Sequence, residues 1–256
     1  MSKVLRNLKL IIAYDGTDFL GWQRQRRGAT VQGTLERALA TITGASVDVQ
    51  GSGRTDAGVH AAGQVANFKT SCPIPTANLL KALNNLLPPT VRIRGVSEVP
   101  DSFHARHNAR AKTYRYRILQ APVALPFINR FVYHYPYPLD RRNMAAAAKL
   151  FEGEHDFTSF AGSEGHAVAG ARGGDNVRRI FSSKILWRPK LDLIVYEVRG
   201  NGFLHHMVRN LAGTLIEVGR GKLGPRDMLR ILEARSRSEA GPTAPPSGLC
   251  LVRVEY

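Results

Sequence analysis

A charge pair framed by glycines is the first candidate for chemistry in this sequence. Arg54 and Asp56 stand in residues 51–61, which read Gly-Ser-Gly-Arg-Thr-Asp-Ala-Gly-Val-His-Ala. Glycines let a backbone turn sharply, so the two charges are expected at a loop and not in the core. An ionised aspartate held there can act as a nucleophile or as a base. The structural alternative is that Asp56 caps the short segment after it, with Arg54 as its surface partner.

The pattern of residues 51–61 excludes two common binding loops. A P-loop requires Gly-Lys-Ser or Gly-Lys-Thr, and a dinucleotide fingerprint requires Gly-x-Gly-x-x-Gly at the start of a long helix. The sequence shows no Ser-His-Asp pattern, second well-placed carboxylate or cofactor motif. We therefore expect chemistry that uses one carboxylate among arginines and a tyrosine, with no cofactor and no metal.

A second candidate lies in residues 201–210, Asn-Gly-Phe-Leu-His-His-Met-Val-Arg-Asn, at the start of a predicted helix. Adjacent histidines on a helix point in different directions, and the metalloprotease pattern His-Glu-x-x-His is absent, so no metal site is predicted at His205 and His206. Arg209 lies off the buried stripe of this helix. It is either available to a carboxylate or a phosphate, or it is an ordinary surface arginine.

Basic and aromatic side chains alternate near the middle of the chain, in residues 103–117. On a strand, Tyr114 and Tyr116 share one face while Arg115 and Arg117 share the other. Such side chains can stack on the bases of RNA and contact its phosphates. The alternative is a buried aromatic face and a solvated charged face. Including the basic loop at 23–28, the candidate RNA-contacting residues are Arg24, Arg106, Arg110 and Arg115.

The first half of the chain reads as a βαββαβ unit that would carry the Asp56 loop. Helical spacing starts after Thr30, a good N-cap, and stops at Gly44. A second helix is capped near Thr76. Strands are predicted at 8–14, 47–50, 64–70 and 91–99. This order is typical of a ferredoxin-like split unit.

The second half repeats the order more loosely. The sequence predicts strands at 111–119, 178–187, 191–199 and 248–256, helices at 140–153 and 204–218, and an extra helix opened by Pro225. Residues 154–156 read as a polar loop. The glycine-rich residues 162–175 are either a loop that closes over a substrate or an insertion without consequence.

We therefore predict an α+β fold with two similar βαββαβ (ferredoxin-like) halves, a mostly antiparallel sheet and a cleft between the halves. The expected subdomains are residues 1–105, with the Asp56 loop, and residues 106–256, which complete the cleft. A cleft between subdomains is a common place for a ligand site.

Composition favours a polyanionic partner. The 256 residues include 36 Lys and Arg against 20 Asp and Glu, a formal net charge of +16, and 43% are hydrophobic, which suffices for a sizeable core. The two cysteines, Cys72 and Cys250, are too few for a zinc site or a disulfide framework. No apolar run approaches the roughly 20 residues of a membrane span. We expect a soluble, cytoplasmic protein that binds nucleic acid.

Taken together, these motifs make the chain resemble the tRNA pseudouridine synthases of the TruA family. The resemblance covers nearly the whole chain, and its central block, residues 53–61, is highly specific for that family. Further blocks match in the same order. They are Tyr14-Asp15-Gly16-Thr17 with Phe19, Gly21-Trp22-Gln23 and Gln25; Thr30-Val31-Gln32 with Leu35-Glu36; Gly63-Gln64-Val65; Phe103-His104-Ala105-Arg106; Tyr114-Arg115-Tyr116; and Gly202 to Asn210.

The resemblance implies roles for four residues. Asp56 would be the essential aspartate, and Arg209 would pair with it from the second half. Tyr114 would pack on the uracil and remove the proton at C5. Arg54 would enter the space that the target nucleotide leaves when it flips out of the helix, a step that costs a few kcal/mol.

By the same resemblance, the substrate would be uridine at positions 38, 39 and 40 of tRNA, and the protein would be a homodimer. Residues 163–176 match nothing in the family pattern. A non-catalytic RNA-binding module and a pseudouridine synthase for another RNA are the alternatives.

Overall fold

The chain folds as two compact units that each combine helices with a sheet. The computed structural model describes residues 5–162 and 176–256, so residues 163–175 of the expected glycine-rich loop lie outside the described residues. One unit comprises Met1–Arg110 with Cys250–Tyr256, and the other comprises Ala111–Leu249. Most of the strand pairs are antiparallel. The predicted α+β class with a mostly antiparallel sheet is thus confirmed.

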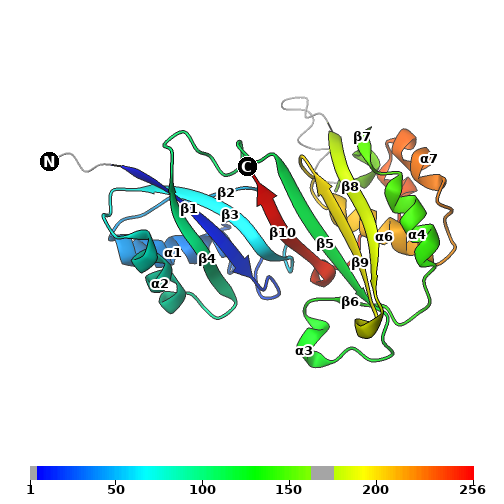
Figure 1. Ribbon diagram of the computed structural model, residues 1–256, viewed down its shortest axis with the longest axis horizontal. Coiled ribbons are helices and arrows are strands. Elements are labelled where there is room, and N and C mark those ends of the chain that lie inside the picture. Colours follow the sequence, from blue (N-terminus) through cyan, green and yellow to red (C-terminus); the bar gives the residue numbers. More distant parts are fainter. Residues whose placement is uncertain (1–4, 163–175) are drawn as a thin grey trace. The chain divides into compact units, whose positions relative to one another are not determined.

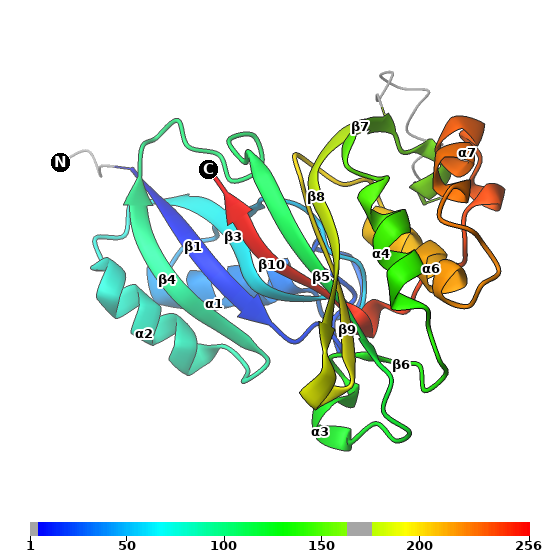
Figure 2. The same cartoon turned by 45° about the vertical axis from the view of Figure 1, so that its right-hand side comes forward.

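The first unit has the predicted order of elements. They are β1 (Arg6–Tyr14), α1 (Val31–Thr43), β2 (Gln50–Gly51), β3 (His60–Thr70), α2 (Thr76–Leu86) and β4 (Val91–Val99). β1 pairs antiparallel with both β3 and β4. Helices α1 and α2 lie on one face of this sheet (Figures 1 and 2). Leu8, Leu10 and Ile12 alternate along β1 and are fully buried, as period-two burial of one sheet face requires.

Helix α1 begins and ends where the sequence predicts. The Thr30 hydroxyl accepts a hydrogen bond from Gly33 N, and Gly44 ends the helix in the left-handed conformation with φ 72°. Thr30 therefore satisfies one of the orphan N–H groups of the first turn, and glycine takes the positive φ without strain.

The strand predicted at 47–50 is shorter than expected, since β2 starts at Gln50. Side chains of α1 form hydrogen bonds with the backbone N–H and C=O groups of Val49, the residue before β2. Val49 N donates to Glu36 Oε1 (3.3 Å), and Val49 O accepts from Gln32 Nε2 (3.0 Å). A residue whose backbone groups are satisfied by a helix cannot pair them with a neighbouring strand.

The second unit builds its sheet in the order β5-β9-β8-β7, with β6 beside β5. Helices α4 and α6 pack against each other and against this sheet (Figure 2). The elements are β5 (Ala111–Leu119), α3 (Pro126–Asn129), β6 (Tyr133–His134), α4 (Arg141–Lys149), β7 (Gly153–Asp156), β8 (Val177–Arg188), β9 (Leu193–Gly200), α6 (Met207–Gly219) and α7 (Asp227–Ala234). Short 3-10 turns lie at Thr158–Phe160, Pro189–Leu191, Arg237–Glu239 and Pro246–Gly248.

Three local predictions in the second unit are corrected. Residues 154–156 form part of β7, paired with β8, and not a polar loop. The helix expected to reach residue 153 ends at Lys149. The helix expected from residue 204 starts at Met207, because His206 has a left-handed backbone with φ 58° and cannot continue a right-handed helix backwards.

The C-terminal strand β10 (Leu249–Glu255) pairs parallel with β3, where Cys250 lies opposite His60. The sequence analysis predicted this strand as the last element of the second half. The boundary at residues 105 and 106 stays a prediction. Within residues 5–162 and 176–256, no helix is both long and apolar enough to span a membrane.

Candidate active site

The loop that carries Arg54 and Asp56 connects β2 to β3 and is anchored at its start by Ser52 and Gln64. Both side chains are fully buried. Ser52 Oγ donates to Gln64 Oε1 (2.6 Å), Gln64 Nε2 donates to Gly53 O (3.0 Å), and Ser52 N donates to Val65 O (2.8 Å). Since β3 itself supplies these partners, the loop is fixed to the sheet and not to mobile surface groups.

Thr55, between the two charged residues, points into the core. Its hydroxyl lies 2.8 Å from the hydroxyl of Tyr14, and its carbonyl oxygen accepts from Trp22 N (3.0 Å). A phenol is already protonated at neutral pH, and burial raises the pKa of the Tyr14 hydroxyl further. Because Thr55 faces inward, its neighbours Arg54 and Asp56 are turned away from the core.

Gly21 allows the segment after β1 to approach this loop. Its φ is +88°, and a Cβ placed there would lie 2.6 Å from Thr55 O. Any side chain at this position would collide with backbone that cannot move aside. The glycine of the Gly-Trp-Gln block is thus explained by a close approach to the Asp56 loop.

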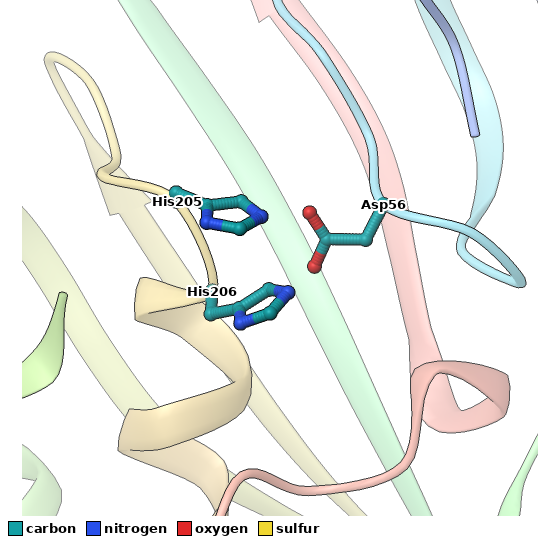
Figure 3. Close-up of side chains that lie close together, drawn as sticks. All are labelled: Asp56, His205 and His206. Atoms are coloured by element: carbon teal, nitrogen blue, oxygen red, sulfur yellow. The ribbon is translucent and has the colours of Figure 1, made fainter. Parts of the chain in front are cut away.

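Asp56 is half-buried and Arg54 is exposed. Figure 3 draws Asp56 on the loop that enters β3, with its carboxylate directed away from the loop backbone. The segment after Asp56 is one turn, closed by Val59 N donating to Asp56 O (3.2 Å). Arg54 Nε donates to Gln23 Oε1 (3.2 Å). The loop therefore presents one carboxylate and one guanidinium on either side of a buried threonine.

In the second unit, Tyr114 lies on β5, with 8% of its surface exposed, and makes an edge-to-face contact with Phe203 at 5.1 Å between ring centroids. Tyr116 is fully buried, and its hydroxyl donates to Pro245 O (2.9 Å). The aromatic face of β5 is therefore buried, as the structural alternative for residues 103–117 expected. Burial leaves little surface of Tyr116 for stacking on a base.

Arg209 is anchored to the loop that follows α7. Its Nε donates to Ala244 O (2.8 Å), and Ala244 N donates to Arg209 O (3.2 Å). The fully buried Asn210 holds the same loop, because its Oδ1 accepts from Thr243 Oγ1 (2.7 Å) and from Arg237 (3.2 Å). Arg209 is thus a fixed group and not a free surface arginine.

His205 and His206 form a stacked pair that sequence reasoning did not expect. Their rings stack with 3.8 Å between centroids and 30° between planes, just before α6 (Figure 3). The prediction that they point in different directions is wrong, because it assumed a regular helix and His206 has a left-handed backbone. His205 O also accepts from Gly162 N (2.9 Å). The expected absence of a metal site stays a prediction.

The four candidate RNA-contacting arginines differ in their surroundings. Arg106 and Arg110 are exposed. Arg24 forms an ion pair with Glu36 (3.0 Å), and Arg115 forms one with Glu197 (2.6 Å) across the β5–β9 pair. An arginine that already pairs with a carboxylate must share or lose that partner to bind phosphate, so Arg106 and Arg110 are better placed for it.

Gln32 and Glu36 are functional candidates to which sequence reasoning gave no role beyond their place in a family block. They lie on α1 among its apolar residues, with only 5% and 8% of their surfaces exposed. Polar residues at core positions of a helical pattern are a usable signal, since buried polar groups require specific partners.

Comparisons with known proteins agree with the resemblance seen in the motifs. A family model described as "tRNA pseudouridine synthase" matches residues 10–108 and 147–256. A protein of Solibacter usitatus called "tRNA pseudouridine synthase A" is 51% identical over 252 residues, which cover 98% of this chain and 100% of that protein. Proteins with the same name from Brevibacillus brevis and Caldicellulosiruptor saccharolyticus are 46% and 44% identical, again over 98% of this chain and 100% of theirs.

Proposed function

Because the chain belongs to the tRNA pseudouridine synthase family, we propose that it isomerises uridine to pseudouridine at positions 38, 39 and 40 in the anticodon stem and loop of tRNA, with Asp56 as the essential carboxylate. The observation that carries this proposal is the anchored loop between β2 and β3. It presents Asp56 and Arg54 outward from the buried Thr55.

The reaction leaves the composition of the nucleotide unchanged. The C1'–N1 glycosidic bond breaks, the uracil turns over, and C1' joins C5; N1 then carries a proton and C5 loses one. The Asp56 carboxylate has two chemical routes open to it. It either adds covalently to the sugar or the base, or removes the proton at C2' to form a glycal.

The other roles follow from the family pattern. Arg54 fills the space left by the flipped uridine, and its contact with phosphate offsets part of the cost of flipping. Tyr114 packs on the uracil and takes the C5 proton, and Arg209 pairs with Asp56. The proposal thus requires a cleft formed by two ferredoxin-like halves, residues 1–105 and 106–256, in which Tyr114 and Arg209 reach the uridine held at Asp56.

Further expectations concern partners and surroundings. The chain acts as a homodimer on tRNA in the cytoplasm, without a cofactor or a metal. The arginines Arg24, Arg106, Arg110 and Arg115 contribute phosphate contacts. The surplus of positive charge, +16 over the chain, supports a nucleic-acid substrate.

Tritium release tests the activity directly. Pseudouridine has the same mass as uridine, but its formation expels the hydrogen at C5. The native protein is expected to release tritium from tRNA transcripts labelled at uridine C5, and carbodiimide mapping is expected to place the product at positions 38–40. If tritium is released only from another RNA, the enzyme acts on that RNA and not on tRNA. If no RNA releases tritium, the protein is an RNA-binding module without this activity.

Asp56→Asn tests the assignment of the carboxylate. The amide keeps the shape of the side chain but cannot serve as a base or nucleophile at neutral pH, so turnover should be abolished while tRNA affinity persists. Asp101→Asn is the matched control, because the Asp101 side chain is 75% exposed and pairs with Lys69 in the same unit. Near-native turnover by Asp56→Asn would refute the role of Asp56.

A further inference from the structure

A continuous chain of hydrogen bonds runs from helix α1 to Arg54, and we call it the α1 relay. Glu36 Oε1 accepts from Gln32 Nε2 (3.2 Å), Gln32 Oε1 accepts from Gln23 Nε2 (2.8 Å), and Gln23 Oε1 accepts from Arg54 Nε (3.2 Å). All of these residues lie in the first unit. The relay thus joins a buried carboxylate to the exposed guanidinium proposed to enter the RNA helix.

The backbone fixes which way the Gln32 amide points. Its Nε2 faces Val49 O (3.0 Å), which can only accept, and its Oε1 faces Arg24 N (2.8 Å), which can only donate. A flipped amide would place oxygen against oxygen and N–H against N–H. The orientation of Gln32 therefore follows from donor and acceptor chemistry and is not a free choice.

The orientation of the Gln32 amide determines the orientation of the Gln23 amide, which in turn orients Arg54. Gln32 Oε1 can only accept, so the amide nitrogen of Gln23 must turn toward it. The oxygen of Gln23 is left facing Arg54, whose Nε can only donate. Each bond in the relay points the same way, and the direction is set at the buried end.

Glu36 secures the buried end of the relay. Its Oε1 accepts from Gln32 Nε2 and from Val49 N (3.3 Å), and its Oε2 accepts from Arg24 (3.0 Å). Both oxygens of this 8% exposed residue are thereby satisfied. A buried carboxylate that has its full set of donors is held firmly, since loss of any donor would leave it uncompensated.

We propose that Gln23 and Gln32 are positioning residues that hold the Arg54 guanidinium in the orientation needed to enter the helix space of the flipped uridine, with Glu36 securing the buried end of the relay. This inference rests on the proposed role of Arg54 in turnover. A long side chain held in advance loses less conformational freedom when it enters the RNA, so the flipped state forms more readily.

A double-mutant cycle with Arg54 tests the relay. The measured quantities are the single-turnover rate of tritium release, with enzyme in excess over tRNA, and the dissociation constant for tRNA. Gln23→Ala and Gln32→Leu are each expected to lower the rate about tenfold, the effect of losing a hydrogen bond to a charged group. The dissociation constant should stay within about twofold, because Arg54 itself remains.

The decisive comparison is made in the Arg54→Ala background. If Gln23 and Gln32 act through Arg54, neither substitution lowers the rate further there, whereas a general structural role gives the same loss in both backgrounds. Gln50→Ala is the matched control and should keep the native rate, because the Gln50 amide donates to Asp48 and lies outside the relay.

Each outcome has one meaning. Losses that vanish in Arg54→Ala support the relay; equal losses in both backgrounds, or a native rate in Gln23→Ala and Gln32→Leu, overturn it. A native rate in Arg54→Ala alone would instead overturn the proposed role of Arg54, so the two failures are distinguishable. If Gln32→Leu fails to fold, the half-buried Gln23 still decides the question.

Discussion

Thr55 is the residue that turns the two charged side chains of the loop outward. It has 6% of its surface exposed; its hydroxyl contacts Tyr14 at the end of β1, and its carbonyl oxygen accepts from Trp22 N in the segment that follows β1. Successive residues of an extended segment point to opposite sides, so burying Thr55 exposes its neighbours. A single buried hydroxyl thereby presents both Arg54 and Asp56 to a substrate.

Two substitutions, Gly21→Ala and Gly44→Ala, distinguish the effect of a steric collision from the effect of backbone strain. Both glycines have positive φ, +88° and +72°, but only a Cβ at Gly21 meets backbone, at 2.6 Å from Thr55 O; nothing lies within 4 Å at Gly44. Gly44→Ala should lower the free energy of unfolding by about 1 kcal/mol, the usual cost of a left-handed alanine, and keep turnover.

Gly21→Ala should lower the free energy of unfolding by more and should also lose turnover, because the Asp56 loop must shift. Urea unfolding and tritium release on the two variants measure both effects. Equal behaviour of the two variants would mean that the approach of Gly21 to Thr55 has no part in holding the loop.

Helix α6 is the element that organises the second unit's part of the proposed site. Arg209 on its first turns is bound to Ala244, and the neighbouring Asn210 is bound to Thr243 and Arg237. Asn210 Nδ2 also donates to Phe160 O (2.7 Å). One helix face thus fixes the loop at 237–244, and that loop in turn holds the guanidinium of Arg209.

Asn210→Leu tests this arrangement at the level of the element. The leucine leaves the buried Phe160 O without its donor and removes the Asn210 oxygen from Thr243 and Arg237, which keep their bond to each other. This should lower the free energy of unfolding by about 2–3 kcal/mol. Turnover should also fall, because the partner of Arg209 is no longer held in place.

Denaturant unfolding and tritium release provide the measurements. Asn143→Leu is the control: Asn143 is an exposed residue on α4 whose Nδ2 donates to Asp140 (2.9 Å), and its loss should cost about 0.5 kcal/mol or less. A comparable loss of stability in both variants would contradict the role assigned to Asn210.

The whole molecule is strongly basic, and this charge governs how it meets RNA. With 36 Lys and Arg against 20 Asp and Glu, the field of the chain attracts a polyanion and raises the rate of encounter. Individual arginines do not contribute equally, because several already pair with carboxylates. The Arg115 side chain is 43% exposed and bound to Glu197, whereas Arg106 is exposed on the loop before β5.

Salt dependence of tRNA binding tests this difference. Each phosphate contact contributes about 0.9 to the slope of log affinity against log salt, so Arg106→Gln should reduce the steepness of that slope by about 0.9. Arg115→Gln should change the slope less, because Glu197 already offsets its charge. A larger change for Arg115→Gln than for Arg106→Gln would show that the Glu197 pair opens to bind RNA.

Short-range signals were enough to predict much of this molecule. Caps and periodicity placed α1 between Thr30 and Gly44, and the strands β4 and β5 have the predicted bounds, because such elements depend on residues a few positions apart. Motif order also predicted the family, which the matches over nearly the whole chain confirm.

Tertiary packing determined the contacts that local sequence patterns did not predict. Gln64 anchors the Asp56 loop from β3, Gln32 connects α1 to Arg54 through Gln23, and β10 pairs with β3 of the first unit. The stacking of His205 on His206 likewise required the left-handed backbone of His206. The bond between Gln23 and Arg54 and the pairing of β10 with β3 join residues far apart in the chain. For the buried polar groups, the need for a partner determines which contacts they make.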